Sequence, residues 1–92
     1  MTVVGTEFAF DPAVLQTKAG ETLTITFENK GKYPHNMIAP ELNINSGYPT
    51  ASGGSTTFTA TVPSGTAAGN YTFWCSVPTH NDRGMVGTIT VG

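Results

Sequence analysis

Apolar and polar residues alternate along several short stretches of the chain. Residues 21–29, "ETLTITFEN", place Leu23, Ile25 and Phe27 on one face and threonines on the other. Residues 55–63, "STTFTATVP", repeat the pattern with Phe58 inward, and residues 71–75, "YTFWC", continue it. A period of two indicates strands with one buried face, so we predict strands over these segments.

Turn signals separate these stretches, and none of them has a helical period. "DP" follows the β-rich residues 2–10, "NKGK" closes the second strand, and "SGTAAGN" precedes "YTFWC". Residues 41–54 are polar and glycine-rich, which favours a surface loop over a single helical turn. Short strands between turns predict an all-β sandwich or barrel.

The size and charge of the chain narrow its classes of function. The 92 residues form one domain, 1–92, because a chain this short has no room for a second core. Charged residues make up only 11% and the net charge is −2, so Lys30 and Lys32 are expected to be solvated rather than to bind nucleic acid. No apolar run approaches the roughly 20 residues of a membrane span. We expect Met1 to be a start residue added to a trimmed chain, because strand-like sequence follows it at once.

Residues 74–85, "WCSVPTHNDRGM", gather unusual side chains in one loop. Cys75, the only cysteine, ends a predicted strand; Met85 begins the next one, and His80 lies between them. The only other histidine, His35, lies in "YPHNMI", where another strand begins. Taken alone, each has an ordinary interpretation: a buried small thiol, a solvated imidazole or a core methionine. Together they offer the thiolate, imidazole and thioether donors that copper prefers.

The residues that carry this chemistry also carry a resemblance. "YTFWCSVPTHNDRGMVGTITVG" resembles the C-terminal signature of the type 1 (blue) copper cupredoxins, the family of plastocyanin, azurin, rusticyanin and auracyanin, and "GKYPHN" resembles their upstream His-Asn segment. The brevity of the chain and "GMVGTITV" are similar to plastocyanin and halocyanin. The four residues between Cys75 and His80, where plastocyanin has two, are similar to rusticyanin and auracyanin.

The resemblance implies a cupredoxin-like Greek-key β-sandwich of about seven or eight strands that binds one type 1 copper ion. His35, Cys75 and His80 would be the strong ligands and Met85 the long axial one. Asn36 would tie the upstream loop to the ligand loop through its side chain. The resemblance also implies that a tyrosine, here Tyr71, fixes a strand corner.

The implied function is outer-sphere transfer of single electrons between redox partners, without catalysis. Partners would dock weakly on an apolar patch around the second histidine of a monomer, formed by His80, Pro78, Val77, Pro34, Met37, Pro40 and Gly84. Association with a membrane would come only through segments removed from this chain. The resemblance places such proteins in the periplasm, in the thylakoid lumen or otherwise outside the cytoplasm.

Other functions remain open at this point. A copper enzyme needs an open coordination position or more histidines, whereas the domain could be the electron-donor module of a larger copper oxidase or reductase. A copper carrier would use paired cysteines or clustered methionines, and this chain has one Cys and three scattered Met. Zinc accepts nitrogen and sulfur ligands but gains little from a thioether.

Overall fold

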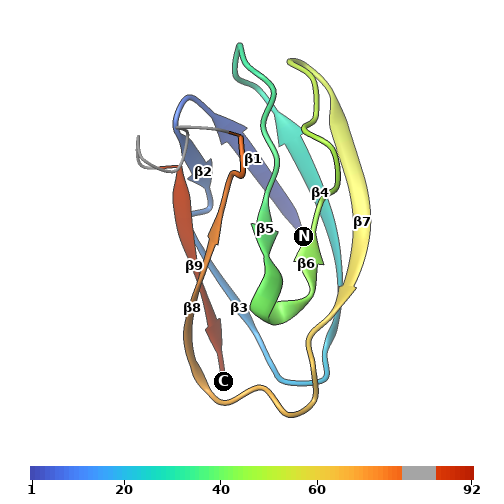
Figure 1. Cartoon of the computed structure of the whole chain (residues 1–92), viewed down its shortest axis with the longest axis vertical. Helices are drawn as coiled ribbons and strands as arrows, with labels where there is room; N and C mark the ends of the chain where they lie inside the picture. The colour runs from blue at the N-terminus through green and yellow to red at the C-terminus, as the bar shows by residue number, and fades with distance from the viewer. Residues whose placement is uncertain (78–84) are drawn as a thin grey trace.

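Two β-sheets pack face to face in the computed structural model, which describes residues 1–77 and 85–92 (Figure 1). One sheet has the strand order β2-β1-β4-β7 and the other β3-β9-β8-β5-β6. The elements are β1 (Thr2–Thr6), β2 (Ala9–Asp11), β3 (Val14–Thr17), β4 (Thr22–Asn29), β5 (Ile38–Ala39), the 3₁₀ turn η1 (Pro40–Leu42), β6 (Ile44–Asn45), β7 (Ser55–Thr61), β8 (Gly69–Trp74) and β9 (Val86–Val91).

Both sheets are mixed. β1 runs parallel to β4 and β3 runs parallel to β9, while the other neighbouring strands are antiparallel. The all-β sandwich predicted from the sequence is therefore confirmed. The described residues form nine strands rather than seven or eight, because β2, β5 and β6 are only two or three residues long and too short to show a period.

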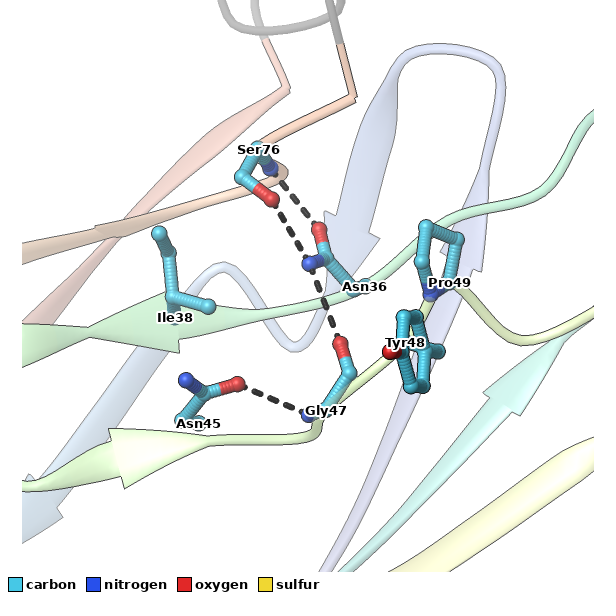
Figure 2. Close-up of a pocket in the computed structure, with 7 residues that line it drawn as sticks. All are labelled: Asn36, Ile38, Asn45, Gly47, Tyr48, Pro49 and Ser76. Carbon is cyan, nitrogen blue, oxygen red and sulfur yellow. Dashed lines mark hydrogen bonds between the residues drawn. The ribbon is translucent and has the colours of Figure 1, made fainter.

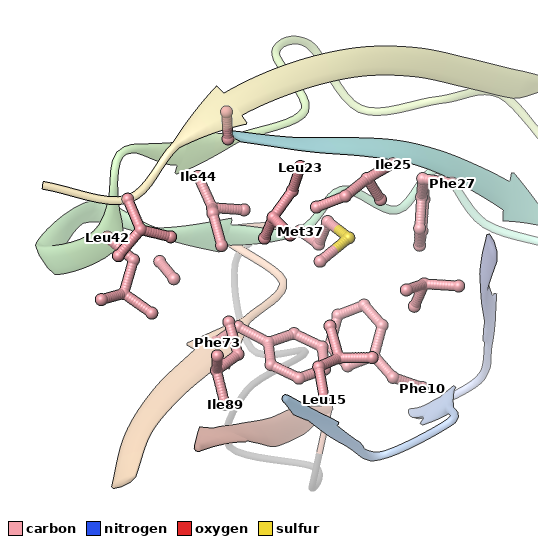
Figure 3. Packing of buried hydrophobic residues seen from close by; sticks show 14 of the residues in the cluster. Phe10, Leu15, Leu23, Ile25, Phe27, Met37, Leu42, Ile44, Phe73 and Ile89 are labelled. Atoms are coloured by element: carbon pink, nitrogen blue, oxygen red, sulfur yellow. The ribbon is translucent and has the colours of Figure 1, made fainter. Parts of the chain in front are cut away.

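The core lies between the sheets and follows the predicted alternation (Figure 3). Leu23, Ile25 and Phe27 of β4 are buried, while the threonines between them face outward. Opposite them, Phe73 of β8 lies against Phe10 of β2, with ring centroids 4.8 Å apart. Each fully buried side chain of this size contributes about 1.5–3 kcal/mol relative to an exposed one, so this layer holds the two sheets together.

The expectation of a surface loop over residues 41–54 is wrong for its first part. Leu42 in η1 and Ile44 in β6 are completely buried, and β6 pairs with β5. Asn43 between them adopts a left-handed conformation with φ of 59°, which turns the chain so that both neighbours point inward. The polar composition of the segment concealed these two apolar anchors.

Two details fix the sheet that carries β8 and β9. The hydroxyl of Tyr71 donates a hydrogen bond of 2.7 Å to the carbonyl of Ala67, which confirms its expected role at the strand corner. Gly87 lies under the ring of Phe73, so closely that a Cβ there would come within 2.3 Å of Cζ. The close packing of β9 against the Phe73 ring therefore requires glycine at position 87.

Candidate metal centre

The pairing of β8 with β9 brings Cys75 and Met85 together. In the last pair of the register Trp74 lies opposite Val86, so the next residues outward along the two strands are Cys75 and Met85. The ladder extends to them, because the Cys75 N–H donates to the Met85 carbonyl at 3.2 Å. Both side chains are completely buried. Antiparallel pairing therefore places a thiol and a thioether side by side without any help from the loop between them.

His35 approaches the same place from the segment before β5. Its backbone pairs with Thr50 in an isolated bridge, with hydrogen bonds of 3.2 Å and 2.7 Å. Its ring is completely buried, and its Nδ1 lies 4.0 Å from the Cys75 Sγ. The structure thus brings together His35, Cys75 and Met85, three of the four predicted ligands, from two distant parts of the sequence.

A side-chain amide at the end of β4 orders the loop that leads to His35. Asn29 is 1% exposed, and its Nδ2 donates bonds of 2.8 Å to the carbonyls of Tyr33 and Thr50. Its Oδ1 accepts a bond of 2.8 Å from the Gly31 N–H. Because Thr50 pairs in turn with the backbone of His35, the position of the imidazole is set by β4 through Asn29.

The spacing of the donor atoms fits a metal ion. With bonds of about 2.3 Å to a thiolate and about 2.0 Å to an imidazole, as zinc makes, an angle of about 120° separates sulfur and nitrogen by about 3.7 Å. The observed 4.0 Å between Cys75 Sγ and His35 Nδ1 is close to this value. A thiolate, an imidazole and a buried thioether are three of the four donors of a trigonal copper site with a weak axial methionine; the remaining donor, a second imidazole, is predicted at His80, outside the described residues.

Asn36 joins the two ligand segments, as predicted (Figure 2). Its Oδ1 accepts a bond of 2.7 Å from the Ser76 N–H, and its Nδ2 donates one of 2.7 Å to the Ser76 Oγ. A third, longer bond of 3.4 Å runs from Nδ2 to the Gly47 carbonyl. Because Asn36 follows His35 and Ser76 follows Cys75, this pair holds the two ligands at a fixed separation.

An open depression of about 450 Å³ lies beside this bridge. It is lined by Asn36, Ile38, Asn45, Gly47, Tyr48, Pro49 and Ser76 (Figure 2). Tyr48 is 96% exposed, and its ring stands beside Pro49 at the border of the depression. An apolar, concave surface therefore adjoins the residues that follow the two ligands.

The second ring nitrogen of His35 faces a carboxylate. Nε2 lies 3.6 Å from Oε1 of Glu7, in the turn between β1 and β2. Partial desolvation raises the pKa of Glu7. Hydrogen bonds from the N–H groups of Tyr33, Lys32 and Glu7 itself lower the pKa, as does the nearby His35, and the net pKa lies below the usual value. The carboxylate is therefore charged at neutral pH.

Several predicted site residues lie elsewhere or outside the described part. His80, Pro78 and Gly84 belong to residues 78–84 and lie outside the described residues, so the complete ligand set stays a prediction. Met37 is completely buried, so its assignment to an exposed docking patch is wrong; its side chain fills the core instead. Pro34 and Pro40 are exposed and Val77 is half-buried. Within 1–77 and 85–92, no three side chains of His, Cys, Asp or Glu form a metal-binding group.

Glu7 adjoins this site although no pattern in the sequence pointed to it. A single glutamate in a strand-rich segment carries no recognisable signal, and only the parallel pairing of β1 with β4 brings it to the loop before His35.

No helix in the described part of the chain is long and apolar enough to span a membrane.

Comparisons with known proteins relate the chain to copper-binding proteins. The family described as copper binding proteins, plastocyanin/azurin family, matches residues 1–92. Chloroplastic plastocyanin of Hordeum vulgare is 39% identical over 97 residues, which cover 95% of this chain and 57% of that protein. Plastocyanin of Sambucus nigra is 33% identical over 93 residues, covering 90% of this chain and 87% of that protein. The crystal structure of dithionite-reduced auracyanin from Roseiflexus castenholzii superposes with a TM-score of 0.81 and 26% identity, covering 99% of this chain and 94% of that one.

Proposed function

Because this chain belongs to the plastocyanin/azurin family of copper-binding proteins, we propose that it carries single electrons between redox partners through one type 1 copper ion. In this proposal His35, Cys75, His80 and Met85 would hold the ion, with the imidazoles and the thiolate as strong donors and the thioether as a weak one. A copper ion bound there supplies the one-electron Cu(II)/Cu(I) couple.

The observation that carries the proposal is the buried approach of Cys75 and His35. Their donor atoms lie 4.0 Å apart, and neither residue is exposed to solvent. Backbone hydrogen bonds hold Cys75 against Met85 and His35 against Thr50, so the donors are positioned by sheet structure. Donors that are fixed before a metal binds need little rearrangement when its charge changes, and this keeps the barrier to electron transfer low.

The rival functions are not favoured. An enzyme needs an open position for its substrate, whereas Met85 as the proposed fourth donor would leave none. The plastocyanins of Hordeum vulgare and Sambucus nigra match at least 90% of this chain at 39% and 33% identity, which favours an electron carrier over the donor module of an oxidase or reductase. A copper-delivery role is not favoured either, because a single buried thiol cannot hand the metal on by exchange with a second one.

Redox partners would dock at the end of the sandwich where Cys75 and Met85 lie. The patch predicted around His80 included Met37, which is buried; in its place we propose a surface that includes His80 and the exposed residues Pro34, Tyr48 and Pro49. Apolar and aromatic side chains suit brief contacts of small area, as electron-transfer encounters require. Such a carrier would work as a monomer in the periplasm, in a thylakoid lumen or otherwise outside the cytoplasm, where copper is available.

Titration of the reduced, metal-free protein with Cu(II) tests the proposed function. The wild type should develop an intense blue or green absorption at one equivalent of copper, which ascorbate bleaches and an oxidant restores. Cys75→Ser should abolish this band, because the absorption requires the thiolate. Ser76→Ala, a change at the neighbouring position that removes no ligand, should retain it. Copper uptake by the wild type without a sulfur-to-metal band would refute the assignment.

The contribution of His80 needs its own variant. His80→Gly should lose the native band, and added imidazole should restore it by occupying the vacated position. A native spectrum in His80→Gly without imidazole would exclude His80 as a ligand and with it the predicted spacing of the loop.

A further inference from the structure

Glu7 reaches the candidate metal centre from the opposite sheet. It lies in the turn between β1 and β2, whereas Cys75 and Met85 adjoin β8 and β9. Its Oε1 lies 3.6 Å from Nε2 of His35, the ring nitrogen that points away from the cysteine sulfur. His35 is completely buried, and the Glu7 side chain is 23% exposed. A charged group thus lies against the rear of a predicted ligand, at the border of the protein interior.

The loop before His35 holds this carboxylate in place. The backbone N–H groups of Lys32 and Tyr33 both donate to Oε1, the latter at 2.7 Å. A Cβ at position 31 would come within 2.5 Å of Oε2, so Gly31 lets the loop lie against the carboxylate without displacing it. Charge-assisted bonds from two consecutive N–H groups fix an anion well. The contact with His35 is therefore part of a built structure and does not depend on a freely rotating surface side chain.

We propose that Glu7 is a positioning residue that orients His35 and strengthens it as a metal donor. The carboxylate stabilises the imidazole tautomer that has its proton on Nε2, and this leaves the lone pair on Nδ1, which faces Cys75. A carboxylate behind a metal-bound histidine also increases the electron density on the coordinating nitrogen. The tautomer is a property of the metal-free chain, whereas the effect on the metal rests on the proposed copper function.

The effect should favour the more positive ion. A fixed negative charge and a more basic imidazole both stabilise Cu(II) more than Cu(I). Loss of the charge should therefore raise the affinity for Cu(I) relative to Cu(II). Because Glu7 is partly solvated, we expect a threefold to tenfold change. At 59 mV per tenfold for one electron, this is an increase in reduction potential of about 28–59 mV.

Glu7→Gln separates the charge from the hydrogen bonds. The glutamine Oε1 can still accept from Lys32 and Tyr33, so the loop keeps its support while the negative charge is lost. Glu41→Gln is the matched control, because Glu41 lies on η1, beyond β5, and its loss changes the net charge equally. Spectroelectrochemistry of the copper-loaded proteins should give a higher potential for Glu7→Gln and an unchanged one for Glu41→Gln. An increase in reduction potential of less than about 28 mV in Glu7→Gln, which is threefold in relative affinity, would overturn the proposal. An equal increase in Glu41→Gln would overturn it as well.

The tautomer can be measured without copper. In the ¹⁵N-labelled metal-free wild type, long-range proton–nitrogen correlation spectra should show the proton of His35 on Nε2. A proton on Nδ1 would overturn the inference even if Glu7→Gln failed to fold. An intact charge-transfer band with the wrong tautomer would refute only the role of Glu7. The absence of the band with the correct tautomer would refute the copper function and leave the role of Glu7 in orienting the ring standing.

Discussion

Asn36→Ala should weaken the metal-free protein by breaking the bridge between the two ligand segments. The wild-type side chain is 3% exposed and makes two hydrogen bonds of 2.7 Å with Ser76. A typical intramolecular hydrogen bond contributes about 0.5–1.5 kcal/mol net, so the pair contributes about 1–3 kcal/mol. Ser76 is exposed, so water replaces the lost partner on that side and keeps the cost near the middle of this range.

A loss of about 2 kcal/mol is large for a domain of 92 residues. It lowers the ratio of folded to unfolded molecules about 30-fold, and the midpoint of thermal unfolding should fall by about 8–16 °C. Urea denaturation of the reduced apoprotein, followed by the fluorescence of the single tryptophan, Trp74, measures it directly. Trp74 lies two residues before Ser76, so it reports on the affected end of β8.

Ser76→Ala provides the control for this prediction. It removes the hydroxyl that accepts from Asn36 Nδ2 but keeps the backbone N–H that donates to Oδ1. It should therefore cost about half as much as Asn36→Ala. A stability of Asn36→Ala within about 0.5 kcal/mol of wild type would show that the bridge contributes nothing to folding. Equal losses in the two variants would show that the hydroxyl, and not the amide as a whole, carries the stabilisation.

Three further substitutions test the packing and the axial donor. Gly87→Ala should lower the free energy of unfolding by at least about 1–3 kcal/mol in urea denaturation, because the new methyl group overlaps the ring of Phe73. The control Gly65→Ala, with no atom within 4 Å of the added Cβ, should stay within about 0.5 kcal/mol of wild type. Equal stabilities of the two variants would contradict the close contact. Tyr71→Phe should lose about 1 kcal/mol with its 2.7 Å bond at the strand corner, and an unchanged unfolding midpoint would argue against that role. Met85→Leu conserves volume and should keep the apoprotein within about 1.5 kcal/mol of wild type, but should raise the reduction potential of the copper-loaded form; an unchanged potential would exclude axial donation by Met85.

The sequence predicted those parts of the fold that depend on local alternation. β4 could be located because Leu23, Ile25 and Phe27 share one face over eight residues. Leu42 and Ile44 form an equally buried pair, but they lie within a polar segment and adjoin strands of two residues, so no period could develop. Their burial depends on β6 pairing with β5, which is a tertiary contact.

The candidate site divides in the same way. Cys75 and Met85 could be predicted to meet because both lie at the ends of strands joined by one connection, and antiparallel pairing of such strands is the common outcome. His35 entered through its residue type and its resemblance to a family motif, and its Nδ1 lies 4.0 Å from the Cys75 Sγ. Glu7 could not be predicted, because its role depends on an N-terminal strand pairing in parallel with β4 and on a glycine at position 31 that allows the carboxylate to fit.

Three separate sets of hydrogen bonds support the site, and under the proposed function they limit how far the donors move when the charge of a bound metal changes. The Cys75–Met85 hydrogen bond belongs to one sheet, whereas Asn29, at the end of β4 in the other, orders the loop before His35. Asn36 then connects the two ligand segments. Moving any one donor would break hydrogen bonds in a different element, so the lowest-energy response to a new charge is to keep the donors where they are. Under the proposed function, ordinary backbone and amide hydrogen bonds formed before any metal is bound would supply the small rearrangement that fast electron transfer needs.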